Sequence, residues 1–135
     1  MLNRYNIAVI PHSAQRYNTV GDYYTAHSDL VKVRISELQN ADYEFLIMIH
    51  ELVESYLCAK RGISEAQIDT FDVEHSELDE PGLSEDAPYH KEHMFATSIE
   101  QFIAHELGVD WTHYEEALQR ISESVPVAEA FTEKE

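Results

Sequence analysis

The sequence predicts an α+β protein in which a small N-terminal antiparallel β-sheet precedes a helical bundle of two long helices and one or two shorter ones. Residues 4–38 hold short apolar runs with a partial two-residue alternation, which is typical of strands. Residues 41–61 and 88–107 carry apolar side chains at helical spacing. A chain of 135 residues suits one domain with its own core. We expect this domain over residues 1–121 and a flexible acidic C-terminal tail over 122–135.

The strands are predicted from three apolar segments. "RYNIAVIP" reads as a short strand that Pro11 stops, because proline cannot continue a β ladder. "VGDYYTAHSDLVKVRIS" reads as a hairpin, since its second half alternates apolar residues with Lys32 and Arg34. We place the turn near residues 27–29, and the sheet is expected to be antiparallel.

The first long helix is predicted over residues 41–61. Asn40 or Asp42 is suited to cap its start, and Gly62 is placed to end it, because glycine accepts the left-handed conformation that often follows a helix. The following "SEAQ", residues 64–67, has the pattern of a capping box and predicts a short helix.

The second long helix is predicted to begin near Pro88, with Asp86 as a candidate cap, and to end at Gly108. A last helix is expected after Asp110. Its apolar residues recur at helical spacing: Trp111, Tyr114, Leu118 and Ile121.

The charge balance limits the classes of partner. The net charge is −17, and residues 64–86 hold nine Asp or Glu and no Lys or Arg. This argues against direct binding of nucleic acid, which needs clustered basic residues, and against anionic membrane surfaces. Cys58, as the sole cysteine, indicates a reducing compartment, and no apolar run is long enough for a signal peptide or membrane span. We therefore expect a cytoplasmic protein.

The segment "IHELVESYL", residues 49–57, carries the most informative polar residues. On a helical wheel His50 and Glu54 lie on one face, within about 60° of each other and among apolar residues. Burying an unpaired carboxylate costs several kcal/mol or forces it to take a proton. A divalent cation held by the imidazole and the carboxylate compensates for this cost, and a spacing of four residues brings both to one ion.

Two ligands make a weak site, so a third is expected from the second long helix. His93 lies there on a face of small and apolar residues that a neighbouring helix can approach closely. Two imidazoles, one carboxylate and an open position for water are the usual composition of a catalytic zinc site. Glu100 lies on the same face and is either a fourth ligand or a residue that orients a ligating histidine. His90, at the edge of this face, is a weaker candidate.

Glu51 directly follows His50 and lies about 100° round the helix. From there its carboxylate can reach a water on the metal without binding the metal, as the general base does in H-E-x-x-H metallopeptidases. The alternative is a His50–Glu54 pair that is hydrogen-bonded inside a core without metal. "HELGV", residues 105–109, repeats His-Glu-Leu with Val109 where the second glutamate would stand, and we interpret it as an exposed or capping pair.

The run "YEFLIMIHELVESYLCAKRGIS", then "IDTFD" and "APYHKEHMFATSIEQFIAHELGVDW", resembles a group of small proteins encoded by bacteriophages and prophages. The resemblance covers most of the chain and implies a phage or prophage origin, hence the host cytoplasm. The site is also similar to that of zincin-type metallopeptidases, in which a sheet precedes the metal helix. That likeness implies that His50 is the first ligand and Glu51 the base. The chain departs from the pattern because Glu54 replaces a histidine and His93 replaces a glutamate.

Three functions remain open at this stage. The first is a zincin-like hydrolase with an HExxE motif, using Zn²⁺ or another divalent transition metal such as Fe²⁺, Mn²⁺ or Ni²⁺ to cleave a peptide or protein substrate. The second is an acidic phage protein that binds and blocks a basic or DNA-binding host protein, as the charge of −17 suggests. The third is a structural metal site without catalysis. A homo-oligomer is compatible with each of them.

Overall fold

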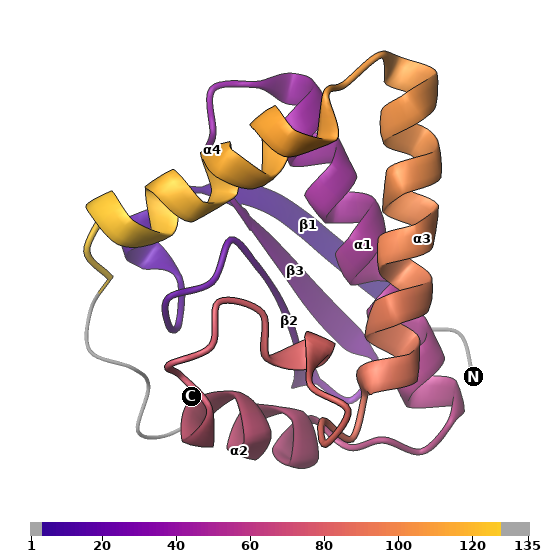
Figure 1. Cartoon of the computed structure of the whole chain (residues 1–135). Helices are drawn as coiled ribbons and strands as arrows, with labels where there is room; N and C mark the ends of the chain where they lie inside the picture. The colour runs from indigo at the N-terminus through magenta and orange to yellow at the C-terminus, as the bar shows by residue number, and fades with distance from the viewer. Residues whose placement is uncertain (1–3, 128–135) are drawn as a thin grey trace.

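The computed structural model describes residues 4–127 and confirms the α+β class (Figure 1). A three-stranded sheet comes first in the chain and four α-helices follow it. The strands and their short helical connection are β1 (Arg4–Ile10), η1 (His12–Ala14), β2 (Gly21–His27) and β3 (Leu30–Ser36). The helices are α1 (Ala41–Lys60), α2 (Glu65–Glu74), η2 (Pro81–Leu83), α3 (His90–Leu107) and α4 (Trp111–Ser124).

The sheet is mixed, so the expectation of a purely antiparallel sheet was wrong. The strand order is β1-β3-β2. β2 and β3 form the expected antiparallel hairpin, whereas β1 lies parallel to β3 along its other side. The cause is the connection of residues 11–20, which is long enough to pass the end of one strand. The chain therefore leaves room for one strand next to β1 before it forms β2, and β3 then fills this place between β1 and β2.

The helix boundaries follow the local capping signals. The side chain of Asn40 accepts a hydrogen bond from the Tyr43 amide and caps α1. Ser64 and Gln67 form the complete capping box at the start of α2. Asp110 caps α4, and Gly108 ends α3 with a φ of 72°. These ends agree with the predicted ones because each depends on neighbours within a few residues.

Two boundaries differ from the predicted ones. α3 begins at His90 without a side-chain cap, so neither Asp86 nor Pro88 starts the helix. The chain before it forms tight turns, in which the His90 amide donates to the Ala87 carbonyl. At the other end, α4 continues to Ser124, past residue 121 where the tail was expected to begin. The part of that predicted tail over residues 128–135 lies outside the described residues.

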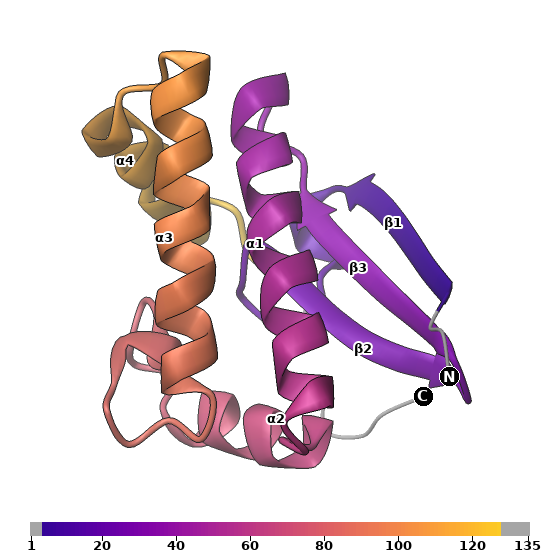
Figure 2. The ribbon, with the colours of Figure 1, turned by 90° about the vertical axis from the view of Figure 1, so that its right-hand side faces the viewer.

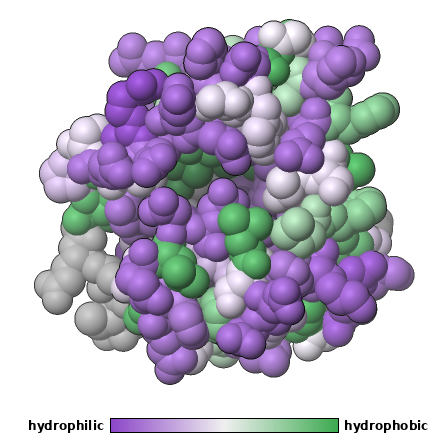
Figure 3. Space-filling model, viewed as in Figure 1, coloured by the Kyte–Doolittle hydropathy of each residue, from purple (hydrophilic) through white to green (hydrophobic). Residues whose placement is uncertain are grey.

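α1 is the central element of the fold. One of its sides packs against β2 and β3 and another against α3, so that it stands between the sheet and α3 (Figure 2). The core between these elements contains fully buried side chains from the sheet, α1 and α4: Val33, Ile35, Leu46, Cys58 and Tyr114. Hydrophilic side chains dominate the face seen in Figure 3, which is hollowed below α4. Among the described residues, no helix combines the length and apolar character needed to cross a membrane.

Candidate metal centre

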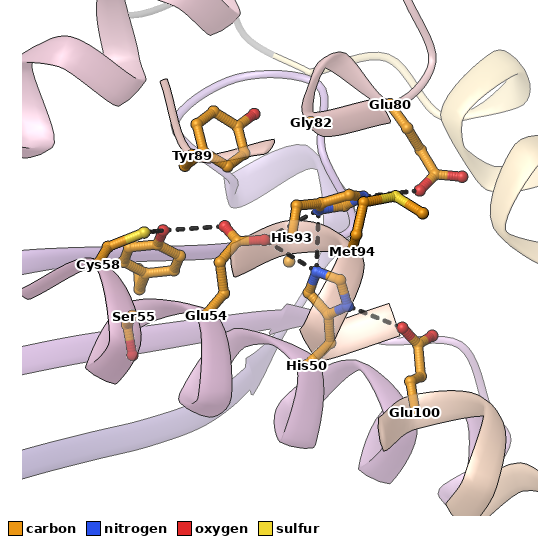
Figure 4. A network of polar contacts seen from close by, with 12 residues as sticks. His50, Glu54, Ser55, Cys58, Glu80, Gly82, Tyr89, His93, Met94 and Glu100 are labelled. Carbon is orange, nitrogen blue, oxygen red and sulfur yellow. Dashed lines mark hydrogen bonds and ion pairs between the residues drawn. The ribbon is translucent and has the colours of Figure 1, made fainter. Parts of the chain in front are cut away.

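Three side chains predicted as metal ligands meet where α1 packs against α3. His50 and Glu54 come from α1 and His93 from α3, and all three are buried. The Nε2 atom of His50 lies 3.0 Å from Oε2 of Glu54 and 3.2 Å from Nδ1 of His93. The distance from Nδ1 of His93 to the same carboxylate oxygen is 2.9 Å. One potential ligand atom of each residue therefore points to a common centre (Figure 4).

The size of this triangle suits a small divalent cation. Zinc binds imidazole nitrogen and carboxylate oxygen at about 2.0–2.1 Å, so the ligand atoms of a tetrahedral site lie roughly 3.3–3.4 Å apart. The observed separations of 2.9–3.2 Å are only a few tenths of an ångström shorter. The cluster could therefore hold a metal ion with small movements of the side chains.

The outer nitrogen of His50 is held by a carboxylate. Its Nδ1–H donates to Oε1 of Glu100 at 2.8 Å, and the hydroxyl of Tyr114 donates to the other oxygen of Glu100 at 2.5 Å. This pair of contacts fixes the ring so that Nε2 faces the centre. Glu100 was predicted either as a fourth ligand or as a residue that orients a histidine. It lies in the second of these positions, because it contacts the nitrogen of His50 that faces away from the centre.

His93 is oriented in the same way by a residue that the sequence analysis did not identify. Its Nε2 lies 3.3 Å from Oε1 of Glu80, which precedes η2. On one side the ring also contacts Gly82, and a Cβ atom at that position would lie only 2.5 Å from Cγ of His93. The glycine therefore allows η2 to cover the imidazole closely. Glu80 is one of nine acidic residues in its segment, and no local pattern distinguishes it from the others.

The carboxylate of Glu54 is also positioned by a second contact. The hydroxyl of Tyr23, on β2, donates to Oε1 of Glu54 at 2.8 Å, which leaves Oε2 directed at the two imidazoles. Tyr23 and Tyr114 were not predicted as site residues. A signal was available, because a tyrosine on a core-facing position needs a partner for its hydroxyl.

Burial and pairing set the charges of the cluster. Burial opposes the positive charge on His50, but its hydrogen bonds with Glu100 and Glu54 outweigh this and hold its pKa well above the usual 6.5. Burial is likewise outweighed at His93, where Glu54 and Glu80 raise the pKa to about 9. Burial would raise the pKa of Glu54, yet the two imidazoles lower it to about 2. Without metal, two N–H groups converge on one carboxylate oxygen.

Glu51 lies beside the cluster on the side of α1 that faces β2. It is half-buried, and its carboxylate is so close to Gly21 that a Cβ atom there would lie 2.8 Å from Oε2. Burial and the neighbouring charge of Glu54 raise the pKa of Glu51 to about 8. Glu51 is not part of the group formed by His50, Glu54 and His93.

The remaining candidates lie outside the group. Nδ1–H of His90 donates to the carbonyl oxygen of Gly82, so this histidine fastens η2 to α3. His105 and Glu106, the second His-Glu pair, are both exposed, as expected. Cys58 is buried, and burial raises the pKa of its thiol to about 12, as for an unreactive thiol in the core.

Comparison of the chain with known protein families, with curated proteins and with solved structures finds no match.

Proposed function

We propose that this protein is a metal-dependent hydrolase whose ion, Zn²⁺ or another divalent transition metal, is bound by His50, Glu54 and His93. The supporting observation is the triangle of three buried ligand atoms, each on a side chain that a further residue holds in place. Two imidazoles and one carboxylate are a usual set of protein ligands for a catalytic zinc ion and would leave one position for water.

The proposed reaction is hydrolysis of an amide, with a peptide as the substrate class. A cation held by His50, Glu54 and His93 would polarise a water and lower its pKa, which makes it a better nucleophile. In this reaction Glu51 would accept a proton from the water as its oxygen attacks the carbonyl carbon, and the same carboxyl would then protonate the leaving amine as the C–N bond breaks. The pKa of about 8 for Glu51 falls when a cation binds nearby, which brings the carboxylate into the range of a base.

Glu51→Gln is expected to keep one bound metal ion and to lose at least about a hundredfold in hydrolysis, the usual contribution of a general base. Hydrolysis of a mixture of unlabelled peptides, followed by mass spectrometry, measures the rate without a known substrate. Glu106→Gln is the matched control, since Glu106 also follows a histidine but is exposed on α3; it should hydrolyse at the wild-type rate. Full activity in Glu51→Gln would show that this residue is not the base.

A structural metal site is the second candidate, and the close cover of His93 favours it. Gly82 lies against the imidazole, and all three ligands are buried, which limits the access of a substrate. In that case the ion ties α1 to α3. The two candidates differ in one result: a structural site binds metal with high affinity but supports no hydrolysis by the wild-type protein.

A further inference from the structure

The two edges of the sheet differ in how far the chain covers them. At the β2 edge, the backbone N–H and the hydroxyl of Thr25 both donate to Glu65, in the first turn of α2. At the other edge, β1 pairs with β3 alone within residues 4–127. Figure 2 shows β1 as the outermost strand, on the side of the sheet away from α3.

The backbone of β1 alternates between β3 and this outer edge. The Arg4 amide donates to Asp29, and the Ile10 carbonyl accepts from Glu37, so the backbone groups of these even-numbered residues point toward β3. Successive residues of a strand direct their N–H and C=O groups to opposite sides. The outer edge therefore presents the N–H and C=O groups of Tyr5, Ile7 and Val9.

The side chains of the same three residues form an apolar row. Their register partners on β3 are Val31, Val33 and Ile35, which are buried on the face that α1 covers. α1 packs over β2 and β3 and leaves the row on β1 partly uncovered. The exposed fraction is 37% for Tyr5, 38% for Ile7 and 43% for Val9. β1 also has no Lys, Glu or Pro, the residues that commonly protect an edge strand from pairing.

We propose that β1 is a dimer interface, in which it pairs antiparallel with β1 of a second copy about a twofold axis at Ile7. In this register Ile7 lies opposite Ile7 of the second copy, and Tyr5 lies opposite Val9. The outward backbone groups of these residues then form about six hydrogen bonds. The two three-stranded sheets become one continuous sheet, and the two apolar rows become one.

The composition of β1 favours a second copy as the occupant. The segment "RYNIAVI" is self-complementary in this register, because each of its outward apolar residues meets an apolar residue. It brings no carboxylate of β1 to the axis, although each chain carries a net charge of −17. Its one charged residue, Arg4, already pairs with Asp29 at 3.0 Å. Repulsion between the two chains is thus long-range and is screened at about 0.15 M salt.

Ile7→Lys is expected to convert the dimer into a monomer, because two like charges would face each other at the axis. Sedimentation velocity over a dilution series at physiological salt should show wild-type dimer dissociating on dilution and the variant monomeric throughout. Val73→Lys is the matched control, since Val73 is equally exposed but lies on α2, and it should behave as wild type. Circular dichroism checks that each variant is folded.

Cysteine cross-linking tests the register. Opposed residues in a hydrogen-bonded antiparallel pair have Cα atoms about 5.5 Å apart, within disulfide range. Ile7→Cys should form a disulfide-linked dimer on mild oxidation, whereas Tyr5→Cys and Val9→Cys should link only when mixed with each other. Cys58 is buried and does not interfere. The proposal is overturned if wild type is monomeric at all concentrations, even if β1 captures an added peptide. A dimeric Ile7→Lys or cross-linking at position 5 or 9 alone would overturn it too.

Discussion

His93→Ala is expected to lose the bound metal ion and the stability that the ion provides. A ligand that binds only the folded state stabilises it by about 4 kcal/mol when its free concentration exceeds Kd about a thousandfold. For a chain of this length that corresponds to a shift in Tm on the order of 10 °C. Addition of zinc should therefore raise the Tm of the wild-type protein and leave that of His93→Ala unchanged.

His90→Ala is the matched control for this experiment. His90 lies one turn earlier on α3, but its Nδ1 contacts the Gly82 carbonyl and it is outside the ligand group. The variant should keep both the metal and the zinc-dependent rise in Tm. If His93→Ala bound zinc as tightly as the wild-type protein, His93 would not be a ligand.

Metal affinity is expected to depend steeply on pH, by about a hundredfold per pH unit from the two histidines. Without metal and below pH 9, His93 is protonated, since its pKa is raised to about 9, and the pKa of His50 is also raised well above 6.5. Binding requires a lone pair on Nε2 of His50 and on Nδ1 of His93, so each ring must lose one proton. Because protons compete with the metal, affinity rises with pH, and the dependence flattens only above the pKa values of both rings.

Calorimetric titration with zinc in two buffers of different ionisation enthalpy measures this proton release directly. Near pH 7 we expect about two protons per ion from the two imidazoles, and up to one more from Glu51, whose pKa of about 8 falls when the ion binds. Glu54 contributes none, because its pKa of about 2 leaves it ionised. Zinc binding without proton release would contradict this assignment of the ligand atoms.

The meeting of His50, Glu54 and His93 was predictable because each part of it follows from helical geometry. His50 and Glu54 are one turn apart on a largely apolar face, so the helix period alone places them together and directs them inward. Small residues beside His93 indicated close approach of a second helix. Ala96 is indeed fully buried in α3, and α1 packs against this helix.

The residues that orient His50, Glu54 and His93 come from distant segments of the chain. Local sequence patterns do not identify them. Glu80 reaches His93 from an acidic stretch in which other carboxylates looked equivalent, and what selects it is the path of the chain through η2. The parallel pairing of β1 with β3 has the same origin. A strand pattern indicates which face is buried, but the neighbour of a strand depends on how the connection crosses the sheet.

The most direct test of the metal centre is the metal content of the untagged wild-type protein, purified without chelator and measured by mass spectrometry. We expect about one equivalent of zinc or another transition metal per chain. Absence of metal, even after dialysis against zinc, would contradict the assignment. His50, Glu54 and His93 would then be a hydrogen-bonded group within the core.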